Sequence, residues 1–211
     1  MEVEKILRNS EKLGKNRSST KVLFQALNIL KINKKNIVRR AGFGVIELAI
    51  AIVLAKIPDT IPKTESALST INTVLLAFFA VVFTGYAFFQ ALINDTLLMF
   101  MINEDAEKKT ENSSKLEESN YYFAEVMMLQ FVVIMINMLL ILTLGILPME
   151  WCLFDNQIVN ETLCIVGIFG MLYINTESLW ETKSFIFNVF QLFNAHAMSR
   201  IISILKKKKD N

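Results

Sequence analysis

The chain has 211 residues, of which 53% are hydrophobic, and it carries a formal net charge of only +2. Its mean hydropathy of +0.42 and its long apolar runs are atypical of a soluble globular domain. Composition therefore argues against the soluble globular classes and predicts an all-α integral membrane protein.

The first 36 residues form a basic leader. Residues 1–40 contain eleven Lys or Arg against three Glu. Residues 1–19 show no clear period, but from Thr20 apolar side chains recur at helical spacing, which predicts a short amphipathic cytoplasmic helix. Such a helix either lies at the anionic inner surface of the membrane or packs as a solvated leader beneath the bundle.

Four apolar stretches follow the leader. They are residues 37–57, 68–93, 121–147 and 163–180. A bilayer core is about 30 Å thick, and a helix needs ~20 mostly apolar residues to cross it. We therefore predict a polytopic, four-helix transmembrane bundle over residues 37–180.

Basic residues alternate between the connections of these stretches. The 58–67 connection has one Lys, the charged 103–120 loop has three, the 149–162 connection has none, and the chain ends near four consecutive lysines. Lys and Arg are retained on the cytoplasmic side of a membrane. Both termini and the 103–120 loop are thus predicted to be cytoplasmic. The Lys-, Asn- and Ile-rich composition suggests a bacterial plasma membrane.

Residues 181–211 are predicted to form a second amphipathic cytoplasmic helix, which continues from the fourth span and ends in the lysines. Apolar residues mark one of its faces, but polar residues are too frequent for a good span. The alternative is a fifth span over residues 185–204, and the positive-inside bias argues against it. Just before this tail, Asn175 and Glu177 mark either a substrate-facing patch or the cytoplasmic exit of the fourth span.

Glu47 lies near the middle of the first apolar stretch. A charged group at that depth costs about 2.5–3.5 kcal/mol on insertion scales. Small residues at Gly44 and Ala51 share its helical face, which predicts that Glu47 looks into the bundle. Three interpretations stay open: a protonated side chain that hydrogen-bonds a neighbouring helix, an ion or proton site, or a span edge that leaves Glu47 near the headgroups.

Depth matching predicts partners for Glu47. If each helix rises about 1.5 Å per residue, Tyr86, Gln130 and Tyr173 fall at roughly the same depth as Glu47. We therefore predict an intramembrane polar layer made from some of these four residues.

A polar stripe accompanies this layer. Tyr86, Gln90 and Asn94 are spaced by four residues, so they share one face of the second apolar helix. The stripe either joins helices through hydrogen bonds or lines a water-filled path. Asn137, deep in the third stretch, is expected to hydrogen-bond between helices.

The residues that usually carry chemistry are sparse. His196 is the only histidine, and no Cys, Asp or Glu stands near it at metal-ligand spacing, so neither a metal site nor a cofactor is predicted. The two cysteines, Cys152 and Cys164, are expected to be free thiols. Acidic residues near the inner interface are scattered, which disfavours a membrane enzyme.

These features predict a non-enzymatic, multi-pass membrane protein that acts through protein–protein contact. Immunity against a membrane-active toxin and a subunit of a membrane complex, such as a secretion or defence system, are two forms of this prediction. The alternative is a small transporter or oligomeric ion channel that uses Glu47 and the Tyr86–Gln90–Asn94 stripe. The expected partners are the bilayer, anionic headgroups at the cytoplasmic face, and a protein partner or a second copy, with no nucleic acid.

Overall fold

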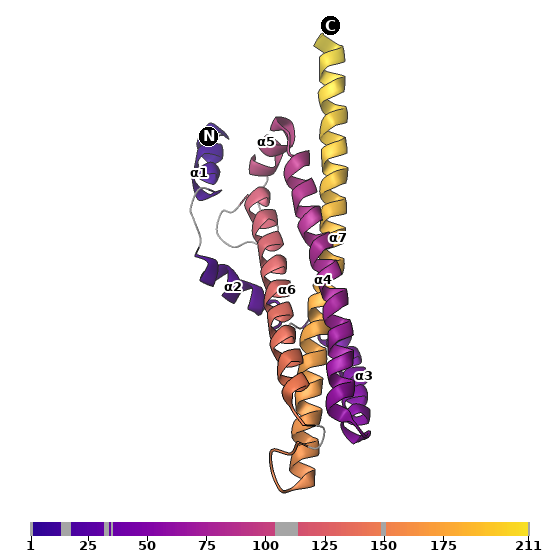
Figure 1. Ribbon diagram of the computed structural model, residues 1–211. Coiled ribbons are helices and arrows are strands. Elements are labelled where there is room, and N and C mark those ends of the chain that lie inside the picture. The colour runs from indigo at the N-terminus through magenta and orange to yellow at the C-terminus, as the bar shows by residue number, and fades with distance from the viewer. Residues whose placement is uncertain are drawn as a thin grey trace. The chain divides into compact units, whose positions relative to one another are not determined.

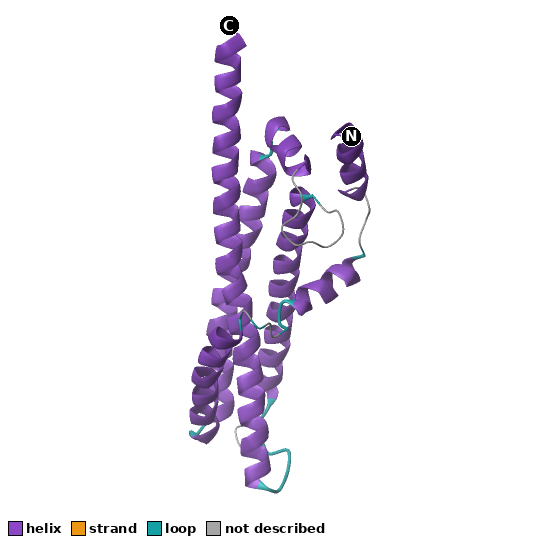
Figure 2. Ribbon diagram, turned by 180° about the vertical axis from the view of Figure 1, so that it is seen from behind, coloured by secondary structure: helices purple, strands orange, loops and turns teal. Residues whose placement is uncertain are grey.

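The computed structural model describes residues 2–13, 18–31, 34, 36–103, 114–148 and 151–210. Every regular element in these ranges is a helix, so the predicted all-α class is confirmed (Figures 1 and 2). The helices are α1 (Glu2–Leu13), α2 (Ser19–Asn28), α3 (Ile37–Lys56), α4 (Thr60–Leu92), α5 (Asp95–Asn103), α6 (Lys115–Ile146) and α7 (Gln157–Asp210).

Three helices in the described part of the chain are long and apolar enough to cross a membrane. They are α4, α6 and the part of α7 from Gln157 to Ile201. α3 has 20 residues, which is also sufficient for a span, but it carries four charged residues in this short length, namely Arg39, Arg40, Glu47 and Lys56. The structure thus supports the membrane-protein class that the composition predicts.

The connection between α3 and α4 is shorter than the predicted 58–67 segment, because α4 already begins at Thr60. Pro62 lies in the first turn, where a missing backbone N–H removes no helical hydrogen bond. The chain reverses at Asp59, which has a φ of 59°. The Thr60 hydroxyl donates to the carbonyl of Ile57 at 2.8 Å and closes the turn.

The 103–120 loop is also shorter than predicted, because α6 begins at Lys115. The Ser114 hydroxyl accepts a hydrogen bond from the Glu117 N–H at 3.3 Å, which caps the helix. Acidic side chains in the first turn interact favourably with the helix dipole, and they help α6 to begin within a polar sequence. Residues 104–113 of the predicted loop lie outside the described residues.

The tail helix is continuous with the fourth apolar stretch. α7 runs without a break from Gln157 to Asp210, so it contains residues 163–180 and extends through the tail. The Asn156 side chain accepts a hydrogen bond from the Ile158 N–H at 3.0 Å and caps its start. The 54 residues of α7 are more than twice the ~20 that one span requires.

Packing divides the chain into two compact units. Unit 1 comprises residues 1–26, 80–128 and 182–211. Its core is aromatic: the centroid of the Phe123 ring lies 5.1 Å from the centroid of the Phe89 ring and 5.0 Å from that of the Phe185 ring. α1, which was not predicted from the sequence, packs on α5. The Asn9 amide there donates to the carbonyl of Ile102 at 2.8 Å.

Unit 2 comprises residues 27–79 and 129–181. Its buried apolar cluster is formed by Ala51, Leu68, Ile168 and Met171. Because the start of α3 contacts the region of Glu177 and its later part packs beside Ile168, α3 and α7 run antiparallel in this unit.

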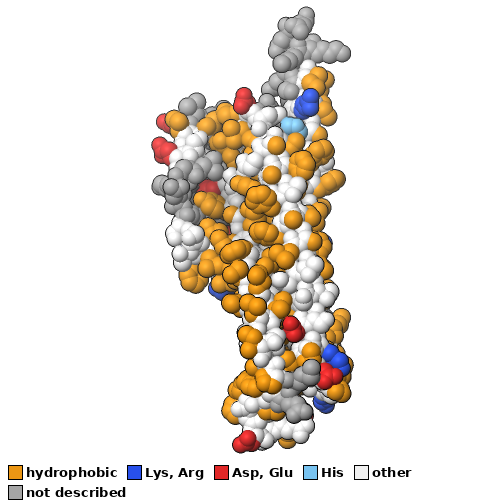
Figure 3. Space-filling model, in the orientation of Figure 1, with side chains coloured by type: hydrophobic (Ala, Val, Ile, Leu, Met, Phe, Trp, Pro, Cys, Tyr) orange, Lys and Arg blue, Asp and Glu red, His pale blue; other side chains and the backbone are white. Residues whose placement is uncertain are grey.

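The outward surface of the long helices is apolar. Large hydrophobic side chains are exposed along α3, α4, α6 and α7, and they cover much of the face shown in Figure 3. Examples from four helices are Val45, Phe83, Leu139 and Val166, each more than half exposed. Exposed apolar area on this scale is typical of a surface that meets lipid or a protein partner.

Gly85→Ala is expected to destabilise the fold by about 1–3 kcal/mol, because overpacking a filled core forces side chains to shift. A Cβ at Gly85 would lie 2.8 Å from the Phe185 ring, which is itself buried against Phe123. At Gly44, nothing beyond the neighbouring residues and the local backbone of α3 lies within 4 Å of an added Cβ, so Gly44→Ala is the matched control. Thermal unfolding in detergent measures both variants, and equal midpoints would contradict the prediction.

Candidate functional site

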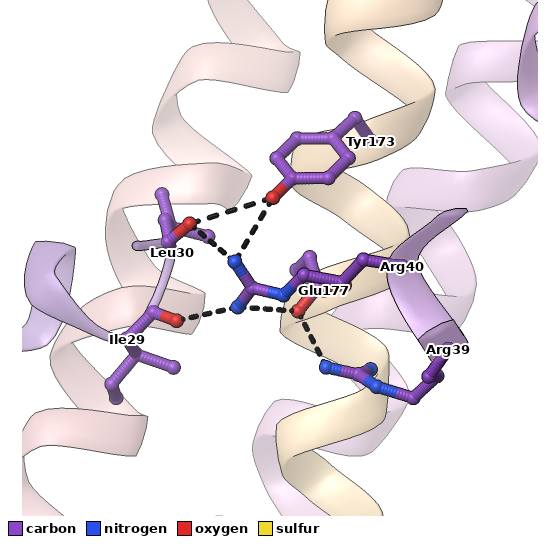
Figure 4. A network of polar contacts seen from close by, with 6 residues as sticks. All are labelled: Ile29, Leu30, Arg39, Arg40, Tyr173 and Glu177. Carbon is purple, nitrogen blue, oxygen red and sulfur yellow. Dashed lines mark hydrogen bonds and ion pairs between the residues drawn. The ribbon is translucent and has the colours of Figure 1, made fainter. Parts of the chain in front are cut away.

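Two arginines converge on one buried carboxylate in unit 2. Arg39 and Arg40, in the first turn of α3, each place a guanidinium nitrogen 2.9 Å from Oε2 of Glu177 on α7 (Figure 4). The side chains of Arg40 and Glu177 are only 4% and 1% exposed. We refer to these three residues as the ion-pair cluster.

Arg40 also binds the turn that follows α2. Its guanidinium donates to the carbonyls of Ile29 and Leu30 at 2.8 and 2.7 Å, and to the Tyr173 hydroxyl at 3.1 Å. Figure 4 shows the guanidinium between this turn and Glu177. A buried charge is tolerated when it is paired and its donors are used. Arg40 thus fixes the leader turn, α3 and α7 to one another.

Arg39 lies nearer the edge of the cluster. Its side chain is 16% exposed, and its guanidinium carbon lies 4.5 Å from the centroid of the Trp180 ring. Phe43 meets the same ring edge-on with centroids 5.5 Å apart. The cation–π contact adds to the attraction between α3 and α7.

Three buried asparagines join α4, α6 and α7. The Asn137 amide donates to Oδ1 of Asn72 at 3.3 Å and to Oδ1 of Asn175 at 2.7 Å. Asn175 donates back to Oδ1 of Asn137 at 3.1 Å and to the carbonyl of Met171 at 2.8 Å. Asn137 therefore makes the interhelical hydrogen bonds expected from its depth. Asn72 was not predicted from the sequence. The pattern that could have identified it is a single amide side chain within an apolar run.

Tyr86, Gln130 and Tyr173, the other three residues of the predicted polar layer, are not joined to Glu47 by hydrogen bonds. Glu47 is 5% exposed, and neither carboxylate oxygen accepts a hydrogen bond from any residue that the structure describes. The Tyr173 hydroxyl is instead bound by Arg40. Gln130 is fully buried in unit 2, whereas Tyr86 belongs to the aromatic core of unit 1. Equal depth does not fix the direction of a side chain, so depth matching misassigned these partners.

The members of the predicted stripe have separate local roles. Gln90 donates to Oδ1 of Asn120 on α6 at 3.3 Å, which joins two helices. Asn94 accepts from the Leu97 N–H at 2.8 Å and caps α5. Tyr86 packs against Phe123, with ring centroids 6.1 Å apart.

Two hollows lie at the other end of unit 2. A largely apolar cavity of about 220 Å³ and a wider pocket of about 920 Å³ share Thr60, Ile61 and Cys164 in their walls. Both cysteines are free, as the sequence predicts. Among the described residues no three or more His, Cys, Asp or Glu side chains are grouped to hold a metal ion. The wider pocket is lined by charged residues of both signs, Lys56, Asp59, Asp155 and Glu161.

Comparison of the chain with protein-family models, curated proteins and solved structures finds no match. Its role must therefore be argued from its own residues. The feature with the most specific chemistry is the ion-pair cluster, together with the unpaired carboxyl of Glu47 two turns further along α3.

Glu177→Gln is expected to destabilise unit 2 by about 3–5 kcal/mol, because it leaves the buried guanidinium of Arg40 and the partly buried one of Arg39 without their carboxylate. Glu161→Gln is the control, since Glu161 accepts an exposed hydrogen bond from Gln157 one turn away. Chemical denaturation of the two variants in mixed micelles compares their free energies of unfolding. A Glu177 variant as stable as the Glu161 variant would show that the cluster has no structural role.

Proposed function

We propose that the chain is a four-span membrane protein in which α3 is the first span and both termini are cytoplasmic. The charged side chains of α3 make its placement in a membrane costly, and the ion-pair cluster supports a means of lowering that cost. Arg39 and Arg40 lie in the first turn, where arginine can reach the interface, and Glu177 neutralises one of them. The alternation of basic residues along the connections supports the same orientation.

Under this topology the basic leader and the terminal lysines face anionic headgroups. Each basic residue near such a surface contributes about 1 kcal/mol of attraction. Arg40 binds the turn after α2 to α3 and α7. This contact supports a position of the leader close to the inner membrane interface. The Lys206–Lys209 side chains enter this proposal from the sequence alone.

The topology predicts that Cys152 is labelled from outside the cell. Cys152 is exposed and lies in the connection before α7. This connection contains no Lys or Arg. A membrane-impermeant maleimide added to intact cells should modify Cys152 in a Cys164→Ser background. A cysteine introduced at Ser18 should react only after the membrane is permeabilised. The reverse pattern would overturn the proposed orientation.

We propose further that the protein acts through protein–protein contact in the membrane, without catalysing a reaction. Toxin immunity and membership of a secretion or defence complex are the two forms we favour. One observation carries this proposal: the ion-pair cluster and the three buried asparagines of unit 2 bind one another across helices, whereas the outward surface is apolar. Such a structure supports a rigid bundle with a surface suited to lipid and to other helices.

The test of this proposal is recovery of a partner. Cross-linking in cells, followed by affinity purification in a mild detergent, should yield a defined protein or a second copy of this chain. An unrelated four-span protein with the same tag is the control for non-specific capture. Recovery of the monomer alone at every cross-linker concentration would contradict the proposal.

The second candidate is a small transporter or oligomeric channel that uses Glu47 with the Tyr86–Gln90–Asn94 stripe. The observation that favours it is the buried carboxyl of Glu47, which has no hydrogen-bond partner among the described residues. Ion flux in liposomes that disappears in Glu47→Gln would support this candidate over the first. Flux that is unchanged in this variant would remove Glu47 from any transport mechanism.

A further inference from the structure

Glu47 faces the interior of unit 2. The buried residues of α3 are Arg40, Glu47 and Ala51, which follow one another at intervals of seven and four and therefore share one helical face. Both carboxyl oxygens of Glu47 are buried, and neither has a hydrogen-bond partner among the described residues. An acidic group in this setting requires a specific source of charge compensation.

Among the described residues of unit 2, no cation makes a hydrogen bond or ion pair with the Glu47 carboxyl. Arg40, on the same face, lies seven residues away, or about 10 Å along the helix axis. Its two terminal nitrogens are already bound to Glu177, to Tyr173 and to the carbonyls of the leader turn. Lys56 stands at the far end of α3 and is exposed. Glu47 therefore differs from Glu177, which receives two guanidinium groups.

The apolar cluster separates Glu47 from the hollows at the other end of the unit. Ala51, one turn further along α3, is fully buried together with Leu68 on α4. Met171 on α7 belongs to this cluster and also lines the 220 Å³ cavity. Along α3, the fully buried Ala51 thus lies between Glu47 and the residues that line the wider pocket.

The surroundings also disfavour a metal ion. A short turn joins α3 to α4, so residues at similar distances from that turn lie at similar levels along the two helices. By this measure Asn72 lies within about one helical turn of the level of Glu47. The side-chain oxygens of Asn72, Asn137 and Asn175 each accept an amide hydrogen bond. A hard cation needs several oxygen ligands, and these oxygens are already engaged.

We propose that Glu47 is a proton-binding site, so that its carboxyl is neutral in the folded protein at neutral pH. The neutral form removes the cost of an unpaired charge in an apolar interior. The ionisable groups on the elements packed around it stand further toward the two ends of the unit. They are Arg39, Arg40 and Lys56 on α3, Lys63 and Glu65 on α4, and Glu161, Cys164, Tyr173, Glu177 and Glu181 on α7, with none on α6 between residues 129 and 146.

Infrared spectroscopy of the protein in lipid tests this directly, because neutral and ionised carboxyl groups absorb in separate regions. At neutral pH the wild-type protein should show a neutral-carboxyl band that Glu47→Gln removes and Glu161→Gln retains. Glu47→Gln mimics the neutral acid, so it should keep the wild-type unfolding midpoint. Identical wild-type and Glu47→Gln spectra, or a Glu47→Gln variant that is as destabilised as Glu177→Gln, would overturn the proposal.

Carbodiimide labelling separates this inference from the proposed membrane placement of α3, on which it rests. The carboxyl O–H adds across one C=N bond, so that oxygen bonds to carbon and the proton passes to nitrogen, and acyl transfer to nitrogen then gives a stable adduct. A lipid-soluble carbodiimide should label Glu47 but not Glu177, and a water-soluble one should label the exposed Asp155 but not Glu47. Labelling of Glu47 by the water-soluble reagent would overturn the membrane placement, whereas the infrared band decides the protonation state separately.

Discussion

The contact of Glu177 with two arginines is the interaction on which unit 2 depends. It lets α3 pack its charged first turn against α7 with Arg40 almost fully buried. The same guanidinium binds the turn after α2, so one side chain connects segments that are more than 130 residues apart in the sequence. A buried charge that loses its partner is far more costly than an exposed one. The geometry of the cluster therefore constrains how α3, α7 and the leader can be arranged.

The remaining packing follows from the limited role of the hydrophobic effect among lipid-facing helices. Lipid tails are as apolar as leucine, so helix association relies on close packing and on interhelical hydrogen bonds. Unit 2 uses the hydrogen bonds of Asn72, Asn137 and Asn175 for this purpose. Unit 1 instead uses an aromatic core around Phe123 and a close approach at Gly85. The two units thus apply different interactions to the same long helices.

The sequence predicts the helices better than it predicts their contacts. Long apolar runs specify helix type and approximate position because they depend only on local composition. Helix starts at Thr60 and Lys115 escape prediction, since a tolerated Pro in the first turn and a Ser114 cap are individually weak signals. Arg39 and Arg40 enter the sequence analysis only as cytoplasmic charges. Their pairing with Glu177 spans more than 130 residues, and no periodicity within a single sequence reports it. Depth matching failed for Tyr173 because depth does not specify direction, and a nearby guanidinium binds its hydroxyl.

The charges of unit 2 also bear on its orientation. If Glu47 is neutral, Arg39, Arg40 and Glu177 together retain one positive charge at the start of α3. Arg39 is the more exposed of the two arginines, so this excess charge lies at the edge of the cluster rather than at its centre. An ionised Glu47 would balance the sum, but it would lie about 10 Å from Arg40 along the helix axis. The neutral form instead leaves the positive charge beside the basic leader, where the positive-inside rule places it. The proposed protonation of Glu47 and the proposed cytoplasmic location of the leader are therefore compatible with each other and with the buried pairing at Glu177.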